Sequence, residues 1–239
     1  RRPGPAADLG DARGRRVTLV AFDTSTPATV VAVEEGGEVL SRHLPAPPDS
    51  HPAHSTQLLA AAAGLLEEAG SGWPAVDRIG VGTGPGTFTG LRISAATAEG
   101  LRRAQGAAVV GVSSLEALSL PARERWPSRP VCAVIDARRG ELFAAGWTAA
   151  GAVAFGPRVV GPEEAGGLFG PDAAEWAVVG EVPEEFEGAL RSVGVDRPVP
   201  EDALNLIGGA ALCRLAREGE PAKGPLLPDY LREPDARRR

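Results

Sequence analysis

The nine residues Gly82-Thr83-Gly84-Pro85-Gly86-Thr87-Phe88-Thr89-Gly90 lie between a short apolar run and a long helix-forming segment. The run covers residues 78–81, the helix is expected at about 91–104, and a second apolar run follows at 107–112. A strand, a glycine-rich loop, a helix and a strand in this order predict two parallel strands joined by a right-handed crossover. The sequence therefore predicts an α/β layer, with the glycine-rich loop where a strand passes into a helix.

Before this unit, the sequence predicts three antiparallel strands and a helix. The expected strands are residues 17–23, 30–34 and 38–44. Gly36 and Gly37 separate the second and third strands and supply the positive φ of a hairpin turn. The helix, 53–69, ends at Gly70, and its apolar residues cover more than one face, which is typical of a helix buried on two sides.

After this unit, a proline-rich stretch at 121–130 suggests a boundary, and a second α/β half follows. The expected strands are residues 131–136, 142–148, 153–155 and 177–179, and the expected helices are 184–193 and 203–217. Asp202 is the expected N-cap of the last helix. We therefore divide the chain into a disordered extension (1–16), a first half (17–120), a second half (121–232) and a disordered basic tail (233–239).

Composition excludes several classes of protein. The 239 residues carry 25 Lys and Arg against 31 Asp and Glu, a net charge of −6, which argues against non-specific coating of nucleic acid. The longest uncharged apolar stretch, 58–66, is far shorter than the roughly 18 residues of a membrane span. Cys132 and Cys213 form no Cys-X-X-Cys pair, so we expect two small buried thiols and a reducing, cytoplasmic location.

Two loops could hold a phosphate. Asp23-Thr24-Ser25-Thr26 follows the first strand, where a carboxylate could hold Mg²⁺ through water while hydroxyl and N–H groups meet phosphate oxygens. The other interpretation is a turn in which Asp23 and Ser25 bond backbone amides. The glycines of residues 82–90 could likewise form an anion site at a helix N-terminus, or simply allow the helix to pack closely.

The other candidate chemistry is weaker. His51 and His54, with Asp49 nearby, lack a third metal ligand, so we expect surface or capping histidines, and His43 is expected in a strand. At Asp136-Ala137-Arg138-Arg139-Gly140, two arginines stand where a phosphate loop needs glycines, which favours a hairpin turn with a basic tip. The chain has no Gly-X-Ser-X-Gly motif, so a hydrolase gains little support.

Six motifs occur in one order along the chain. They are Leu19-Val-Ala-Phe-Asp-Thr-Ser-Thr-Pro27, His54-Ser55, Gly84-Pro-Gly-Thr-Phe-Thr-Gly-Leu-Arg-Ile93, Gly111-Val-Ser-Ser-Leu-Glu-Ala-Leu118, Ile135-Asp-Ala-Arg-Arg-Gly140 and Tyr230-Leu-Arg232. Together they resemble the TsaB (YeaZ) family of bacterial tRNA threonylcarbamoyladenosine synthesis. The resemblance implies an actin-like, hexokinase-like ATPase (ribonuclease H-like) fold of two α/β halves, the second reduced.

The resemblance also implies a non-catalytic subunit that activates its catalytic paralogue TsaD and works with the ATPase TsaE. That complex transfers threonylcarbamoyl to N6 of adenosine 37 in tRNAs reading ANN codons, so this chain would meet tRNA indirectly, and it would form a homodimer when alone. No catalytic residue, metal or cofactor is expected on the chain itself, and ATP or ADP at the complex interface stays open. The phosphate-loop positions are degenerate in this reading, and they are Asp23, Thr24, Ser25, Gly84, Gly86 and Asp136. Gly208-Gly209 resembles the glycine pair of the adenosine side.

The first two long helices would form the partner interface, because small residues at helical spacing let another helix approach closely. The expected contact residues are Leu58, Leu59, Ala62, Leu65, Leu66, Phe88, Arg92, Ile93, Ala96 and Gly100. The alternative is that both helices are buried within the chain's own fold. A competing function is a small-molecule kinase on the same fold, and the arginines at 138 and 139 argue against it.

Overall fold

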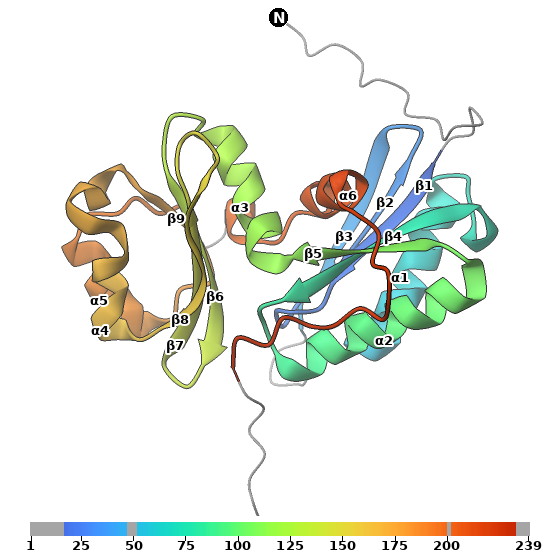
Figure 1. Cartoon of the computed structure of the whole chain (residues 1–239), viewed down its shortest axis with the longest axis horizontal. Coiled ribbons are helices and arrows are strands. Elements are labelled where there is room, and N and C mark those ends of the chain that lie inside the picture. Colours follow the sequence, from blue (N-terminus) through green and yellow to red (C-terminus); the bar gives the residue numbers. More distant parts are fainter. Residues whose placement is uncertain (1–16, 47–51, 200–201, 233–239) are drawn as a thin grey trace, which may run out of the picture.

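The computed structural model describes residues 17–46, 52–199 and 202–232. The expected extension (1–16) and basic tail (233–239), together with His51, lie outside these residues. The described chain forms two α/β lobes, each built on its own sheet (Figure 1). No helix in this part of the chain is both long and apolar enough to span a membrane.

The first lobe contains a five-stranded sheet of order β3-β2-β1-β4-β5. Its strands are β1 (Thr18–Asp23), β2 (Thr29–Glu35), β3 (Glu38–Leu44), β4 (Val76–Gly84) and β5 (Ala108–Ser113). β1 pairs antiparallel with β2 and parallel with β4, and β4 pairs parallel with β5. The three predicted antiparallel strands and the predicted parallel pairing on either side of residues 82–90 are therefore confirmed.

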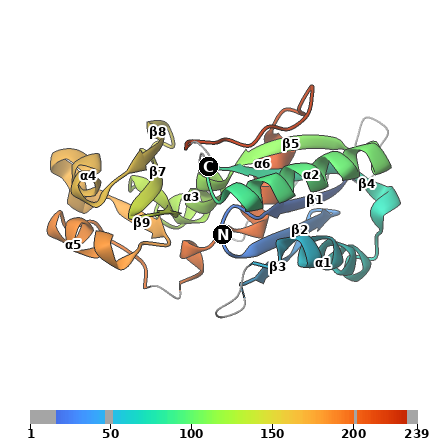
Figure 2. The same cartoon turned by 90° about the horizontal axis from the view of Figure 1, so that it is seen from below.

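Helices cover both faces of this sheet. α1 (His54–Glu68) and α2 (Phe88–Gln105) lie on one face, and α6 (Gly209–Glu218) lies on the other (Figures 1 and 2). β1 shows why both faces are apolar, because its side chains alternate between the two layers. Val20 and Phe22 pack on the α1 side, whereas Leu19 and Ala21 pack on the α6 side.

The second lobe has a four-stranded sheet of order β8-β7-β6-β9. Its strands are β6 (Val131–Arg138), β7 (Glu141–Trp147), β8 (Val153–Val160) and β9 (Ala177–Gly180). Its outer face is covered by α4 (Pro162–Ala165), a 3-10 segment (Gly166–Glu175) and α5 (Glu184–Ser192). β8 is longer than the predicted strand at 153–155, and neither α4 nor the 3-10 segment was expected.

The two lobes share a core. Side chains of α3 (Ser114–Arg125) and α6 pack between the first sheet and the inner face of the second. The boundary placed at residue 120 therefore falls inside α3, which continues through Pro121 to Arg125.

The helix predicted at 203–217 begins later than expected, and it packs on the first lobe instead of the second. Asp202 does act as a cap, since its carboxylate accepts from the Leu204 N–H at 2.9 Å, but it caps only a 3-10 turn (Ala203–Asn205). The chain is extended at Leu206 and Gly208, and α6 begins at Gly209. α6 then packs on the first sheet, where a Cβ at Gly80 would lie 2.4 Å from the Ala216 Cβ.

Candidate functional site

The carboxylate of Asp23 is enclosed at the end of β1. Its Oδ1 accepts from the Ser25 N–H at 2.7 Å, and its Oδ2 accepts from the Ser114 hydroxyl at 2.6 Å. Gly82 packs directly against it, so a Cβ there would lie 1.9 Å from Oδ2. Asp23 is fully buried, and both oxygens are engaged inside the chain, as expected for a turn that the carboxylate itself stabilises.

The two candidate phosphate loops pack against each other. A Cβ at Gly86 would lie 2.4 Å from the Ser25 carbonyl oxygen, and one at Gly90 would lie 1.8 Å from the Thr24 carbonyl oxygen. The Thr87 N–H donates to that Ser25 oxygen at 2.7 Å, and the Thr24 hydroxyl donates to the Gly90 carbonyl at 2.7 Å. These glycines let the 23–26 loop pack on the start of α2. This agrees with the second of the two interpretations above, in which the glycines allow close packing.

Ser114 connects the two candidate phosphate loops, a role that the sequence alone does not reveal. It is the first residue of α3 and is fully buried. Its hydroxyl bonds Asp23 and accepts from the Gly84 N–H at 3.2 Å, so it joins both loops. A serine at a helix start signals only a cap, and Ser113 already fills that role for α3.

His54 is neither a surface nor a capping residue. It is buried at the first position of α1, where its Nδ1 lies 2.8 Å from the Thr29 hydroxyl. Its Nε2 is buried and has no hydrogen-bond partner among residues 17–46, 52–199 and 202–232. Burial lowers the pKa of His54, and the nearby Asp23 carboxylate opposes that shift. His43 lies in β3, as expected.

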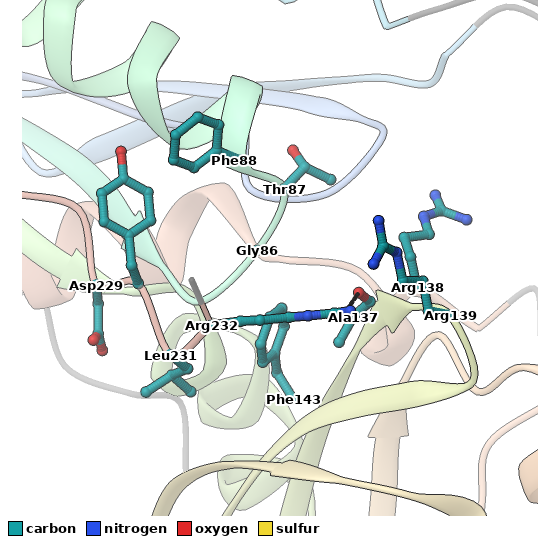
Figure 3. Close-up of a pocket in the computed structure, with 11 residues that line it drawn as sticks. Gly86, Thr87, Phe88, Ala137, Arg138, Arg139, Phe143, Asp229, Leu231 and Arg232 are labelled. Carbon is teal, nitrogen blue, oxygen red and sulfur yellow. Dashed lines mark hydrogen bonds between the residues drawn. The ribbon is translucent and has the colours of Figure 1, made fainter. Parts of the chain in front are cut away.

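A pocket of about 200 Å³ opens between the lobes (Figure 3). The start of α2 forms one side, the β6–β7 turn faces it, and the C-terminal segment completes the wall. The lining residues are Gly86, Thr87, Phe88, Ala137, Arg138, Arg139, Phe143, Asp229, Tyr230, Leu231 and Arg232. It combines arginine side chains, aromatic rings and backbone from both lobes.

Asp136 organises the turn at the edge of this pocket. Its Oδ1 accepts from the Arg138 N–H at 2.6 Å, and its Oδ2 pairs with the Arg138 guanidinium at 2.9 Å. Arg138 and Arg139 both have positive φ, +64° and +58°. The predicted hairpin with a basic tip is therefore confirmed.

The C-terminal strap, residues 219–232, contributes to the pocket and spans both lobes. On the first lobe, the Ala222 N–H donates to Val109 and the Asp229 N–H donates to Thr83, at 2.8 and 2.7 Å. The Tyr230 ring packs against the Phe88 ring, with centroids 5.1 Å apart and planes tilted by 39°. On the second lobe, Arg232 pairs with Glu141 at 2.9 Å. The sequence alone identified Tyr230 and Arg232 only as part of a motif.

The helices proposed as an interface have a buried side and an exposed side. Four of the predicted contact residues are core residues, contrary to expectation, because their side of α1 faces the sheet: Leu58, Ala62, Leu65 and Leu66. Leu59 is 46% exposed. On α2, Arg92, Ala96 and Gly100 are exposed, whereas Phe88 and Ile93 are half-buried. The face available to a partner is thus narrower than predicted.

The two thiols are buried, as expected, and neither approaches the pocket lining. Burial raises the pKa of both Cys132 and Cys213. Among the described residues, no group of three His, Cys, Asp or Glu side chains is placed to hold a metal ion.

Comparison with known proteins gives consistent matches. The model of the TsaD family, tRNA N6-adenosine threonylcarbamoyltransferase, matches residues 46–181. The TsaB of Haemophilus influenzae is 35% identical over 129 residues, which cover 54% of this chain and 53% of that protein. The chain thus spans about half the length of that relative. An uncharacterised protein of Mycobacterium tuberculosis is 30% identical over 92% of this chain and 94% of its own length.

A solved structure extends the similarity over nearly the whole chain. The YeaZ structure from Pseudomonas aeruginosa superimposes with a TM-score of 0.71 and 34% identity, covering 90% of this chain and all of that one. The two sheets and the shared core between them agree with the predicted actin-like arrangement of two α/β halves, which is confirmed.

Proposed function

Because the chain belongs to the TsaB (YeaZ) family, we propose that it is a non-catalytic subunit of the cytoplasmic complex that makes threonylcarbamoyladenosine in tRNA. In this proposal it docks on a TsaD-type catalytic subunit and activates it, a TsaE-type ATPase completes the assembly, and the chain pairs with itself when alone. The observation that carries the proposal is the family membership combined with an exposed, small-residue helix face.

That face lies on α1 and α2, which are neighbours on one side of the first sheet (Figure 2). On α1 the exposed residues include Leu59, Ala60 and Ala63, and on α2 they include Ala96 and Gly100. No atom lies within 4 Å of a Cβ built at Gly100. Small side chains of this kind let the backbone of a partner helix approach closely, and two helices from each chain would make a four-helix interface.

The closed loops support the non-catalytic part of the proposal. An ATPase of this fold needs its first loop open to phosphate, but here the Asp23 oxygens bond Ser25 and Ser114. Gly86 and Gly90 pack on the backbone of the same loop. We therefore propose no nucleotide cofactor for this chain on its own.

Reconstitution tests the proposal directly. The purified chain is mixed with TsaD and TsaE of its own organism, tRNA, ATP and threonylcarbamoyl-adenylate, and modified adenosine is counted with and without the chain. We expect modification to depend on the chain, with no ATP turnover by the chain alone. ATP turnover by the isolated chain, or equal modification without it, would instead favour a kinase or an unrelated function.

Arginine substitutions on the exposed face test the docking step. Ala96→Arg and Gly100→Arg place a long charged side chain where close approach is required, so we expect binding to TsaD to weaken at least tenfold in a pull-down or calorimetric titration. Both sites are exposed, so the thermal midpoint of the chain should stay within a few degrees of wild type.

Matched controls exist for both variants. Ala210→Arg changes an exposed alanine on α6, across the sheet, and Gly188→Arg changes a helical glycine on α5 with no atom within 4 Å of its Cβ. Both should bind TsaD like wild type. If the α2 variants also bind normally, α2 is not the docking face.

A further inference from the structure

We propose that the pocket between the lobes binds a backbone phosphate of RNA, with a neighbouring base stacked on the Phe88–Tyr230 ring pair. This inference rests on the proposed function, because tRNA is the RNA that the complex brings to the chain. It goes beyond that function by giving this subunit a direct contact with the substrate.

Three guanidinium groups line the pocket, from Arg138, Arg139 and Arg232. The Arg138 side chain is 56% exposed, and its ion pair with Asp136 uses one terminal nitrogen, Nη1. Arg232 likewise uses Nη1 for Glu141 and for the Ala137 carbonyl. A guanidinium has five N–H donors in a planar fork, so one edge can hold a carboxylate while another meets a phosphate.

Carboxylates also surround these arginines, and they set the strength of the site. Asp229 lines the pocket, while Asp136 and Glu141 pair with Arg138 and Arg232. Partly exposed ion pairs of this kind contribute little, so a phosphate can compete for the guanidinium groups. The chain carries a net charge of −6, so we expect the contact to be local and weak in the isolated chain.

The backbone at the turn indicates that the arginine side chains have a role of their own. Arg138 and Arg139 both lie in the left-handed region, at φ of +64° and +58°, followed by Gly140 at +71°. Side chains with a Cβ are disfavoured there, and glycine or asparagine would form the same turn more easily. If only the shape of the turn mattered, glycine or asparagine would therefore be favoured over arginine at both positions.

The aromatic pair makes RNA a better match than an acidic peptide. Tyr230 is 42% exposed, its ring packs against Phe88 at a tilt of 39°, and both residues line the same pocket as the arginines. On the α2 side, Arg92 lies over the Phe88 ring, 3.8 Å from its centroid. Unpaired bases of RNA stack on exposed aromatic rings while arginines bind the adjacent phosphate. The carboxylates of an acidic peptide would pair with the arginines but would not stack on the rings.

The test uses the reconstituted complex and the double variant Arg138→Gly/Arg139→Gly. Glycine suits the positive φ at both positions, so this variant should keep or raise the thermal midpoint while it loses two cationic side chains. We expect the KM for tRNA to rise roughly tenfold with kcat unchanged. The slope of log KM against log salt should fall by about 1, because the pocket is proposed to neutralise one phosphate. The matched control is Arg158→Gln/Arg191→Gln, which removes the same charge from exposed positions elsewhere on the second lobe.

Photo-crosslinking to 4-thiouridine-labelled tRNA gives a second readout, with a crosslink expected on the strap at Tyr230. Tyr230→Phe should keep the tRNA KM and Tyr230→Ala should raise it, because only the ring is needed for stacking. A tRNA KM that stays within twofold of wild type in the glycine variant, with crosslinks elsewhere, overturns the inference. A second result would also overturn the inference: the isolated wild-type chain binds ADP, the glycine variant loses that binding, and the tRNA kinetics stay unchanged. The pocket would then be a nucleotide site.

The two proposals fail in different ways. Dependence of modification on the wild-type chain tests the proposed function, whereas the variant's KM tests the pocket. If modification depends on the chain and the variants behave like wild type, only the pocket inference falls.

Discussion

At the residue scale, Asp23 and His54 occupy the same end of the first sheet and are stabilised in different ways. Asp23 accepts two short hydrogen bonds, from Ser25 and from Ser114. Within the part of the chain that the structure describes, His54 bonds the Thr29 hydroxyl and its second ring nitrogen has no partner. A buried carboxylate with two donors is compensated for the loss of water, whereas burial of an imidazole with one partner favours its neutral form.

His54 therefore makes stability depend on pH. Burial lowers its pKa below the ordinary value of about 6.5, so the unfolded chain binds this proton more tightly than the folded chain. The contribution of neutral His54 to the free energy of unfolding is therefore full above about pH 6.5. It decreases as the pH falls below that value, by at most about 1.4 kcal/mol per pH unit. Asp23 reduces this slope, since its charge favours the protonated ring.

The measurement compares urea unfolding at pH 7.5 and 5.5 for wild type and His54→Asn. An asparagine oxygen can replace Nδ1 as the partner of Thr29 and does not titrate in this range. We expect wild type to lose more stability than the variant between the two pH values. Equal losses would show that groups other than His54 govern this pH range, among them His43, whose pKa burial also lowers.

At the element scale, α6 shows where sequence reasoning succeeds and where it ends. The segment predicted as the last helix, 203–217, does contain a helix, α6, which ends at Glu218. Asp202 offered a good cap, but only tertiary structure reveals that the chain must stay extended at 206–208 to cross between the lobes. Local propensity carries no information on which sheet a helix will cover. By contrast, every strand of the first sheet was predictable, because each apolar run was bounded by its own turn.

Gly209 is the position that lets α6 sit this close to the sheet. A Cβ there would lie 2.5 Å from the Ser41 Cβ and 3.0 Å from the Ala32 Cβ, so the helix or β2 and β3 must shift. We expect Gly209→Ala to cost about 1–3 kcal/mol in the free energy of unfolding, as overpacked cores do. Gly188→Ala, in an open helical position on α5, should instead stabilise by up to about 1 kcal/mol. Urea titrations of both variants check the opposite signs, and a neutral Gly209→Ala would mean that α6 is free to move.

At the scale of the whole molecule, the site could be predicted only in part. The positions of Asp23 and Asp136 at strand ends followed from the order of the elements. That Ser114 joins the two loops, and that the strap meets the β6–β7 turn, depend on how residues far apart in sequence meet. The helices α1 and α2 were predicted, but the side of α1 that faces solvent was not, because apolar residues occupy more than one of its faces.

The strap gives the chain a feature that an ATPase of two moving lobes would lack. It is bonded to β4 and β5 through Asp229 and Ala222, and it reaches the second lobe through Arg232. Nucleotide-driven enzymes close their lobes around the ligand, whereas a docking subunit gains from a fixed shape, because a rigid surface loses less entropy when it binds. We therefore expect the strap to restrict the angle between the lobes.

This expectation is measurable with spin labels on cysteines introduced at Ala63 and Gly188, exposed positions in the two lobes. The native thiols can stay, since both are buried and burial raises their pKa. Arg232→Ala removes the strap's ion pair to Glu141 and its hydrogen bond to the Ala137 carbonyl. Because partly exposed ion pairs contribute little, we expect a small broadening of the distance distribution between the labels relative to wild type. Arg158→Ala, an exposed arginine of the second lobe away from the strap, is the control. An unchanged distribution in Arg232→Ala would assign the fixed angle to the core shared by α3 and α6, where the two sheets already meet.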